Sequence, residues 1–462
     1  MAVTGESSQQ IKQVTAYPGR PPVTVQRGSG APFGWWPAVC IALVAAIDRI
    51  EYNLLAGALP TIQEEFGFSD SQGGAIATAG AIAAIVLLLP AGRLADTGRR
   101  TWTVSAIVAV WALLTVGTGL AGTYATLFAV RVLLGAAGQL YNPPASSLLG
   151  DLYPGPGRAR AYGYERMAYF AGLPIGVIAG GALAQTVGWR TGFFLVAIPG
   201  VIIALLMLTV REPVRGLGDS LSRWYSSSSA TASGFDSGTG PDSDPASGLT
   251  PVPMRAQLAA LLRIRTLRSV IIGLSILFFG LGGLFFWMPS FYAREFGLPE
   301  ASAAAVGGGA GLVGIVAGIL AGSRLGDRYH QHRVAIGGWS LLFGTVFLAG
   351  AVTVPVLVPQ AICFTLANVG FAGAIANLTA ANADVVAASR RGLGFAVLQM
   401  LVTLGGALGP WLIGLASDST GSLRWAYTVV LLPLVIGSLI VLNGQRTYPT
   451  DAATALTGGT DD

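Results

Sequence analysis

The sequence predicts an all-α membrane protein with twelve transmembrane helices arranged in two six-helix bundles. Three observations support this fold class: an apolar composition, twelve apolar segments of spanning length, and a repeat that relates the two halves of the chain. Of the 462 residues, 53% are hydrophobic and 11% are charged, whereas a soluble protein carries about 25% charged residues. The 64 glycines agree, because glycine is common in membrane helices and lets them pack closely.

The apolar segments are long enough to cross a bilayer, which takes about 20 residues per helix. We expect the spans at 36–58, 72–91, 101–121, 124–149, 161–184, 191–210, 268–292, 301–322, 334–354, 356–382, 392–415 and 424–442. A polar insert rich in Ser, Gly, Asp and Pro separates the sixth span from the seventh. Its composition predicts a flexible linker, and its basic, semi-apolar end predicts a short helix on the membrane surface.

The chain therefore divides into five parts. We expect a disordered N-terminal tail, since that segment is polar and lacks the apolar core of a signal peptide. The parts are the tail at 1–33, the first bundle at 34–210, the linker at 211–267, the second bundle at 268–443 and a C-terminal tail at 444–462. Ten arginines follow even-numbered spans and three follow odd-numbered spans. The positive-inside rule then places both tails and the linker in the cytoplasm. The richness in Ala, Gly and Arg suggests a bacterial gene, hence a bacterial plasma membrane.

The two halves repeat each other at offsets near 230 positions. ALPTIQEEFGFSD at 58–70 parallels WMPSFYAREFGLPE at 287–300. The sequence RLAD at 93–96 recurs as RLGD at 324–327, 231 positions later (324 − 93). A parallel six-plus-six repeat implies two bundles around an axis along the membrane normal, which suits alternating access to a site at the midplane.

Three charges lie inside the first span, in VAAIDRIEYNLL at 44–55. A charge at the bilayer centre costs at least about 2.5–3.5 kcal/mol, so these side chains must face the protein interior. Arg49 can neutralise one of the two carboxylates, and the other should favour its protonated form. We expect Asp48 to be the main proton-coupling group, Glu51 its helper, and Arg49 the ligand of an anionic head group. The alternative is a salt-bridge network that only fixes helix packing.

Other polar residues in the first half are weaker candidates for substrate contacts. Tyr52 shares the face of Asp48 on a helix, and Arg131 in the fourth span can pair with either Asp48 or Glu51. Pro143-Pro144 should bend or break the fourth span, and polar groups at such a bend either line a cavity or bond to neighbouring helices. The polar residues before this bend are Gln139, Tyr141 and Asn142. Glu165-Arg166 in the fifth span is either a gate pair or an interfacial pair.

The second half carries almost no charge within its spans. Its candidate substrate contacts are Phe279, Trp287, Asn368 and Gln399. This asymmetry suggests that one half handles protons and a charged head group while the other contacts an apolar body. For the aromatic residues at 278–287, packing or lipid contact is the alternative to ligand contact and is the more common use of such residues.

The segment GRLADTGRR at 92–100 resembles the signature loop of the major facilitator superfamily, GxLaDrxGrR, with one residue missing between Asp96 and Gly98. RVLLG at 131–135 is similar to the RxxxG motif of that superfamily. Over about 34–443 the chain is identified as a member, which implies the major facilitator fold. The resemblance also implies a conformational latch formed by Gly92, Asp96, Arg99, Asp327 and Arg328.

A narrower resemblance is to the Spinster family of lysolipid and sphingolipid transporters. It rests on AAIDRIEYNLLAGALPTIQEEFGFSDSQGG at 45–74, on FFWMPSFYAREFGL at 285–298 and on GPWLIGLASD at 409–418. The Asp-Arg pair in the first span is a feature of that family. The chain departs from it at Gly138, where the family has a glutamate, and at Gly405-Gly406, where it has Gly-Asp. The resemblance implies transport of a lysophospholipid or a sphingolipid-like molecule.

Other classes of function fit less well. An enzyme or an ATP-driven pump would need a nucleophile, metal or nucleotide motif, and the sequence has no GxSxG, HExxH or Walker lysine motif. A sensor or scaffold would leave the mid-span charges unexplained. We expect no enzyme activity, no cofactor, no metal site and no nucleic-acid partner. The sequence therefore predicts a monomeric, proton-coupled secondary transporter of an amphiphilic or anionic small molecule. Multidrug transport and transport of a small organic anion are the alternatives.

Overall fold

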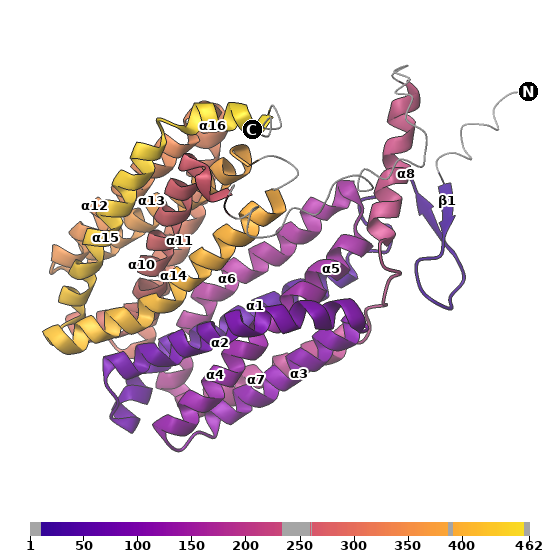
Figure 1. Cartoon of the computed structure of the whole chain (residues 1–462). Helices are drawn as coiled ribbons and strands as arrows, with labels where there is room; N and C mark the ends of the chain where they lie inside the picture. Colours follow the sequence, from indigo (N-terminus) through magenta and orange to yellow (C-terminus); the bar gives the residue numbers. More distant parts are fainter. Residues whose placement is uncertain (1–10, 233–258, 260, 387–390, 457–462) are drawn as a thin grey trace, which may run out of the picture.

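Two helical bundles lie side by side in the computed structural model (Figure 1). The structure describes residues 11–232, 259, 261–386 and 391–456. The first bundle contains α1 (Trp36–Phe66), α2 (Asp70–Thr97), α3 (Arg100–Gly119), α4 (Tyr124–Leu140), α5 (Asn142–Leu152), α6 (Gly155–Val187) and α7 (Trp189–Met207). The second contains α10 (Arg265–Phe296), α11 (Glu300–Arg328), α12 (Arg333–Thr353), α13 (Leu357–Asp384), α14 (Arg391–Thr420) and α15 (Leu423–Gly444), with the short 3₁₀ helix η1 (His330–His332) before α12.

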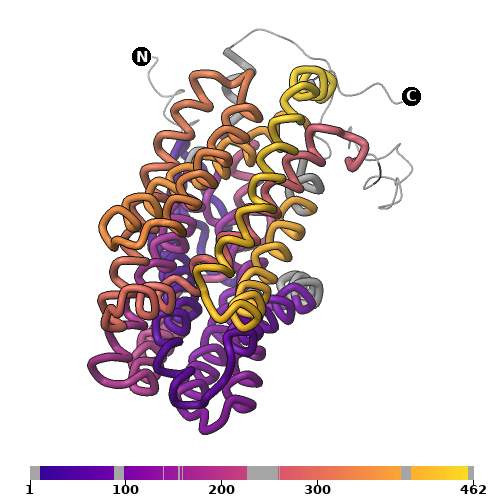
Figure 2. Tube along the Cα trace, turned by 90° about the vertical axis from the view of Figure 1, so that its left-hand side faces the viewer, coloured from indigo at the N-terminus to yellow at the C-terminus, as the bar shows by residue number. Residues whose placement is uncertain are grey.

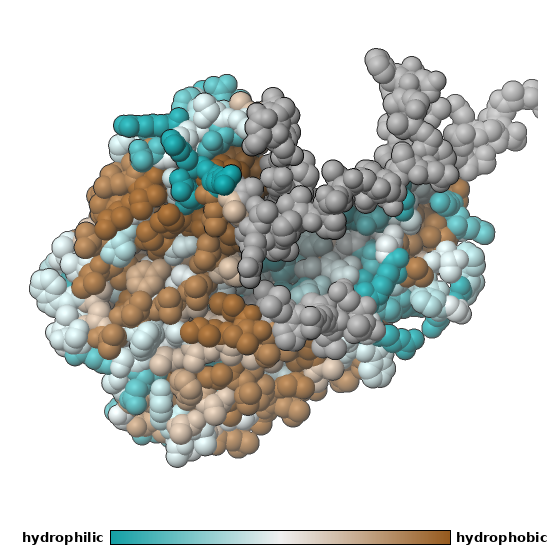
Figure 3. Space-filling view, in the orientation of Figure 1, coloured by the Kyte–Doolittle hydropathy of each residue, from teal (hydrophilic) through white to brown (hydrophobic). Residues whose placement is uncertain are grey.

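Ten helices in the described part of the chain are long and apolar enough to cross a membrane. The other two predicted spans are α1, which carries the three central charges, and the fourth span, which is divided into α4 and α5. Large apolar side chains point outward from the bundles, for example Leu113, Leu432 and Trp425. Figure 3 shows a broad apolar surface over the bundles, with polar residues gathered at the end that carries α8 and α16. Exposed apolar surface of this extent is what lipid contact requires.

The predicted break in the fourth span is confirmed. α4 ends at Leu140, Tyr141 lies between the helices, and α5 begins with prolines in its first turn. Proline is favoured at the start of a helix, where its missing N–H costs nothing, and disfavoured inside one. The consecutive prolines therefore end one helix and begin the next.

Both bundles turn in the same way at their first hairpin. α1 and α10 end at Gly67 and Gly297, which have φ angles of 65° and 62°. Only glycine adopts this left-handed conformation readily, and it is a common helix terminator. We call the end of the molecule with these two glycines the turn face. The opposite end, which carries α16 and the N-terminal strands, is the tail face (Figures 1 and 2).

The expectation of a disordered N-terminal tail is wrong for residues 11–33. β1 (Ile11–Val14) and β2 (Val23–Gln26) form an antiparallel hairpin. This hairpin packs against α8 (Leu217–Ala232), which lies in the segment expected to be a flexible linker. A small apolar core explains both departures, because strands and helix bury their apolar side chains against each other: Ala16, Val25, Leu217 and Leu221.

The other tail and linker predictions have mixed outcomes. Part of the C-terminal tail forms a helix, α16 (Tyr448–Leu456), whose Tyr448 donates a hydrogen bond to Asp384. Most of the segment expected to hold a surface helix, before α10, lies outside the described residues.

Candidate functional site

Two ion pairs lie in the interior of the first bundle. Arg49 Nη2 is 2.6 Å from Asp48 Oδ2, and Arg131 pairs with Glu51. All four residues are buried, with exposed fractions of 6% for Asp48, 8% for Arg49, 0% for Glu51 and 4% for Arg131. The burial agrees with the expectation that charges inside a span face the protein interior.

Glycines allow the neighbouring helices to approach these charges. The Asp48 carboxylate lies against α4, where a Cβ added at Gly138 would be 2.7 Å from Asp48 Oδ1. On the other side of α1, Gly172 and Gly176 of α6 touch the backbone around Ala46 and Ile50. A larger residue at these positions would push the helices apart, so small residues place α4 and α6 directly on the charged part of α1.

Aromatic rings hold Arg49 in place. Its guanidinium lies 5.1 Å from the ring centre of Tyr52 and 4.8 Å from that of Tyr169. Arg49 Nη1 also donates a hydrogen bond of 3.3 Å to the Tyr169 hydroxyl. Cation–π contacts of this kind stabilise a guanidinium away from water. Arg49 would therefore keep a binding environment if its bond to Asp48 were lost.

The charge balance differs from the sequence expectation, which had Arg49 opposing two carboxylates. Arg131 supplies the second cation, and of the two partners considered for it the structure selects Glu51. Arg131 Nη2 also donates to the carbonyl of Tyr52 at 3.4 Å. The site thus contains two carboxylates and two guanidiniums, and its charge is balanced within the protein.

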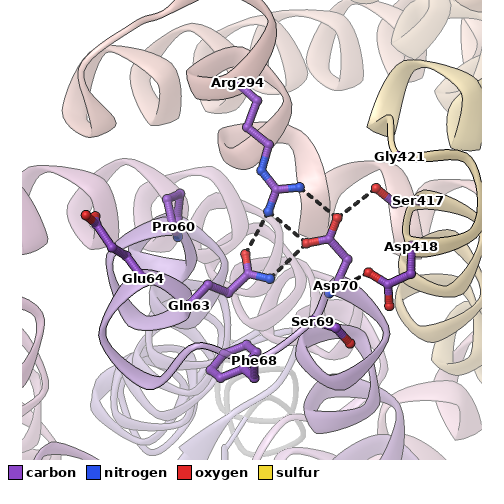
Figure 4. A pocket seen from close by; sticks show the side chains of 10 residues that line it. All are labelled: Pro60, Gln63, Glu64, Phe68, Ser69, Asp70, Arg294, Ser417, Asp418 and Gly421. Carbon is purple, nitrogen blue, oxygen red and sulfur yellow. Dashed lines mark hydrogen bonds and ion pairs between the residues drawn. The ribbon is translucent and has the colours of Figure 1, made fainter.

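A second polar cluster joins the two bundles at the turn face (Figure 4). Arg294 of α10 lies 2.7 Å from Asp70 at the start of α2. Gln63 donates to Asp70 at 2.8 Å, and the Ser417 hydroxyl donates to it at 2.7 Å. Asp418 accepts bonds from the backbone amides of residues 70 and 71. We call these five residues, Gln63, Asp70, Arg294, Ser417 and Asp418, the turn-face cluster; they line a cavity of about 530 Å³.

Tight helix packing between the bundles continues beside this cluster. Thr78 of α2 donates to the carbonyl of Ala407 on α14 at 2.6 Å. A Cβ added at Gly74 would lie 2.2 Å from the Pro410 carbonyl oxygen, and one at Gly181 of α6 would lie 2.5 Å from the Ala304 Cβ on α11. The bundles are therefore closed against each other toward the turn face.

A third cluster of charged residues joins α3, α5 and the segment after α7 at the tail face of the first bundle. The buried Arg100 pairs with Asp151 and with Glu212, whose carboxylate lies 2.8 Å away. Burial raises the pKa of Glu212, but the Thr101 amide and Arg100 outweigh this effect and hold the pKa below its usual value. The second bundle has an equivalent ion pair, in which Arg333 and Asp384 lie 2.8 Å apart. Each of these residues follows its counterpart in the first bundle by 233 positions (333 − 100 and 384 − 151).

Comparison with known proteins identifies the family. The sequence model of the Major Facilitator Superfamily matches residues 41–323 and 312–456. The chain belongs to this superfamily.

Two relatives in the superfamily show the range of the similarity, and the first agrees with the narrower resemblance. The chain is 24% identical to Protein spinster of Drosophila melanogaster, over 87% of this chain and 65% of that protein. It is 26% identical to a putative tartrate transporter of Agrobacterium vitis, over 88% of this chain and 91% of that one. The chain thus spans less than two thirds of the length of the Drosophila relative.

The fold prediction is confirmed by a solved structure. A bacterial homologue of the human lysosomal transporter Spinster, crystallised in an inward-facing and unoccupied conformation, superposes with a TM-score of 0.77 at 21% identity. The superposition covers 90% of this chain and 98% of that one. As a member of this superfamily built from two parallel repeats, the chain is a multi-pass membrane protein.

The substrate contacts that the sequence predicts divide into two groups in space. Tyr52 and Tyr141 lie with the charged pairs, since Tyr141 is in electrostatic range of both Asp48 and Arg49. Asn142 opens α5 directly after Tyr141. The side chain of Gln139 lies outside the described part of the structure.

The candidates from the second half do not gather around the charges. Trp287 is fully buried, and its indole N–H donates to the Pro410 carbonyl at 2.8 Å beside the turn-face cluster. Asn368 donates to Phe364 on its own helix, and Gln399 is exposed and donates to Thr403. The backbone of Phe279 packs against Gly409 of α14. Trp287 and Phe279 thus take part in packing between helices.

The proposed latch residues lie at the tail face. The surroundings of Gly92 and the side chain of Asp96 lie outside the described part of the structure, and Arg99 is exposed. Asp327 is 3.6 Å from Arg333 and mostly exposed, while Arg328 stacks on the ring of Tyr329. Arg100, next to the expected Arg99, is the arginine that forms buried ion pairs, with Asp151 and Glu212.

Sequence reasoning missed the turn-face cluster. Asp70 and Arg294 both lie within the repeated turn segments, so a signal for them was present. Their pairing was not readable, because the two residues are 224 positions apart and meet only where the bundles close.

Proposed function

We propose that this protein is a proton-coupled secondary transporter that moves an amphiphilic or anionic small molecule, such as a lysophospholipid or a sphingolipid-like molecule. The observation that carries the proposal is the pair of buried ion pairs in one bundle. Charges are costly inside a membrane protein, so buried ionisable residues in spans commonly mark substrate or proton paths. Here they include a carboxylate and a guanidinium on adjacent residues of one helix.

Competition for Arg49 links the proton to the substrate. While Asp48 is ionised, it holds Arg49 through a charge-assisted bond of 2.8 Å from Nε to Oδ2. Protonation of Asp48 removes the negative charge and weakens that bond. Arg49, still held by Tyr52 and Tyr169, can then bind an anionic head group. Proton binding and anion binding at this site would then favour each other.

The second ion pair has a supporting role. Glu51 and Arg131 join α1 to α4, and Arg131 also contacts the Tyr52 backbone. We assign this pair to fixing the helices around Arg49, with Glu51 as an alternate proton acceptor.

The closed turn face defines the conformational state. With the tail face in the cytoplasm, as the arginine distribution predicts, contacts at the turn-face cluster close the route to the outside. Transport would require these contacts to break while the tail face closes. We place the protein in the bacterial plasma membrane, with both termini cytoplasmic, and expect a monomer.

A small organic anion is the second candidate substrate. Arg49 is suited to any carboxylate or phosphate, and the Agrobacterium vitis relative, named as a putative tartrate transporter, aligns over 91% of its length. The substrate anion would replace the ionised Asp48 at Arg49 in the same way, but the substrate would have no apolar body.

Proteoliposomes with an imposed pH gradient test the proposal. The probes are labelled lysophosphatidic acid, lysophosphatidylcholine, sphingosine phosphate and tartrate. We expect gradient-driven accumulation of at least one anionic or zwitterionic lipid by the wild type, and loss of the pH dependence in Asp48→Asn. Accumulation of tartrate alone would support the second candidate. Gradient-driven transport that Asp48→Asn leaves intact would overturn the proton role.

A further inference from the structure

A buried carboxylate on α6 has no role in the site described so far. Glu165 has an exposed fraction of 5%, although its ion-pair partner Arg166 is 57% exposed at the side chain. Arg166 Nε lies 3.0 Å from Glu165 Oε2. In an ion pair whose side chains reach the membrane interface, both charged groups would contact water, so the burial of Glu165 needs another explanation.

Helix register places Glu165 between Asp48 and the tail face. α1 and α6 run in the same direction, and a Cβ at Gly172 would touch the Arg49 Cβ at 2.8 Å. Glu165 precedes Gly172 by seven residues (172 − 165), which is about 10 Å along a helix. It therefore lies about two helical turns nearer the tail face than Asp48.

Tyr141 occupies the interval between the two carboxylates. Gly138 contacts Asp48, and Tyr141 follows it by three residues (141 − 138), or about 4.5 Å toward the tail face. Tyr162 of α6 donates a hydrogen bond of 2.7 Å to the Ser146 carbonyl of α5. Because α5 runs toward the tail face and α6 runs away from it, Glu165, three residues after Tyr162, lies near the level of the break between α4 and α5. Tyr141 is accordingly within electrostatic range of Asp48 on one side and Glu165 on the other.

Both groups have unused hydrogen-bonding capacity in the described part of the structure. The Tyr141 hydroxyl is buried without a hydrogen-bond partner, and Tyr141 is only 2% exposed. Glu165 Oε2 is also buried, and its 3.0 Å ion pair with Arg166 lacks the geometry of a hydrogen bond. Buried polar atoms of this kind are rare and costly unless they serve a purpose. The charged and titratable groups around Glu165 are Arg166 and Tyr162 on α6 and Tyr141 from the break.

We propose that Glu165 is a second proton-binding residue, which exchanges protons with the solution at the tail face and passes them to Asp48 through the Tyr141 hydroxyl. In each transfer, Tyr141 accepts a proton at its oxygen from one side and donates its own proton to the other, so no net charge remains on the phenol. The inference rests on the proposed proton coupling and adds the route by which Asp48 is reached. Arg166, exposed beside Glu165, would return Glu165 to its ionised form.

The test compares Glu165→Gln and Tyr141→Phe with the wild type in proteoliposomes, with Glu64→Gln at the turn face as the matched control. Gradient-driven accumulation should fall severalfold in both variants. In Glu165→Gln, exchange of labelled for unlabelled substrate without a gradient should stay at the wild-type rate. Glu165→Asp should recover part of the loss. Unchanged accumulation in Glu165→Gln would overturn the relay.

A second readout separates this inference from the proposed function. Infrared difference spectra of the purified protein between two pH values report protonated carboxyl groups directly. We expect one carboxyl band to disappear in Glu165→Gln and to persist in Glu64→Gln. If the wild type shows no pH-driven transport but this band is present, proton coupling fails while proton binding by Glu165 stands. If the band is unaffected by Glu165→Gln, the inference is wrong.

Discussion

At the scale of single residues, the buried ion pairs show how much the sequence could predict. The mid-span position of Asp48, Arg49 and Glu51 was enough to predict that they face the interior. The pairing of Arg131 with Glu51 was one of two options, because spacing along a helix does not decide which residue of another helix comes closest. Depth in the bundle decides it: Gly138 of α4 lies at Asp48, and Arg131, seven residues earlier (138 − 131), lies nearer the turn face, on the side of Glu51.

Removal of one member of a buried ion pair should lower the free energy of unfolding more than removal of both members. Arg131→Met leaves Glu51, which is 0% exposed, without its cation. We expect a loss of about 3–5 kcal/mol in the free energy of unfolding. The double variant Glu51→Gln with Arg131→Met should recover most of it. Thermal unfolding in detergent measures this, with the exposed Arg446→Met as a control. Equal loss in the single and double variants would contradict the assignment.

At the scale of elements, helices with long apolar faces were predictable and small tertiary units were not. The twelve spans and the proline break follow from local composition. The β1–β2 hairpin does not, because it has few apolar residues and the helix that covers them, α8, begins about 200 positions later. A segment that looks like a disordered tail alone becomes ordered when Leu217 and Leu221 complete its core.

Packing of α2 on α14 is one of the contacts that keep the turn face closed, together with the turn-face cluster and the packing of α6 on α11. A methyl group at Gly74 would meet the Pro410 carbonyl oxygen at 2.2 Å, whereas one at Gly309 of α11 would meet no atom within 4 Å. Overpacking of this kind typically costs about 1–3 kcal/mol. Gly74→Ala should therefore shift the population toward a state with an open turn face, and Gly309→Ala should not.

Spin labels at Glu64 and Ser419, in a background without Cys40 and Cys363, report this opening by pulsed electron paramagnetic resonance. The Gly74→Ala variant should add a longer distance component across the turn face. A distance distribution identical to that of the wild type would show that α2 and α14 do not hold this face closed.

At the scale of the whole molecule, the internal repeat predicted two similar bundles, and the structure extends the repeat to individual contacts. Glu65 pairs with Arg190 in the first bundle, and Glu295 pairs with Arg424 in the second. The bundles differ in their buried charges, since the two buried ion pairs at mid-span belong to the first bundle. The closed face could not be predicted from the sequence, because it belongs to one conformation, whereas the proposed alternating access needs at least two.

The most direct test of the account compares two activities of Asp48→Asn in the same proteoliposomes. One is accumulation of the transported lipid or anion driven by a pH gradient, and the other is exchange of labelled for unlabelled substrate without a gradient. If Asp48 couples the proton to the substrate, the variant loses accumulation and retains exchange, because Arg49 can still bind the anion. If Asp48→Asn accumulates substrate in response to the gradient as the wild type does, the coupling does not pass through Asp48 and the central claim fails.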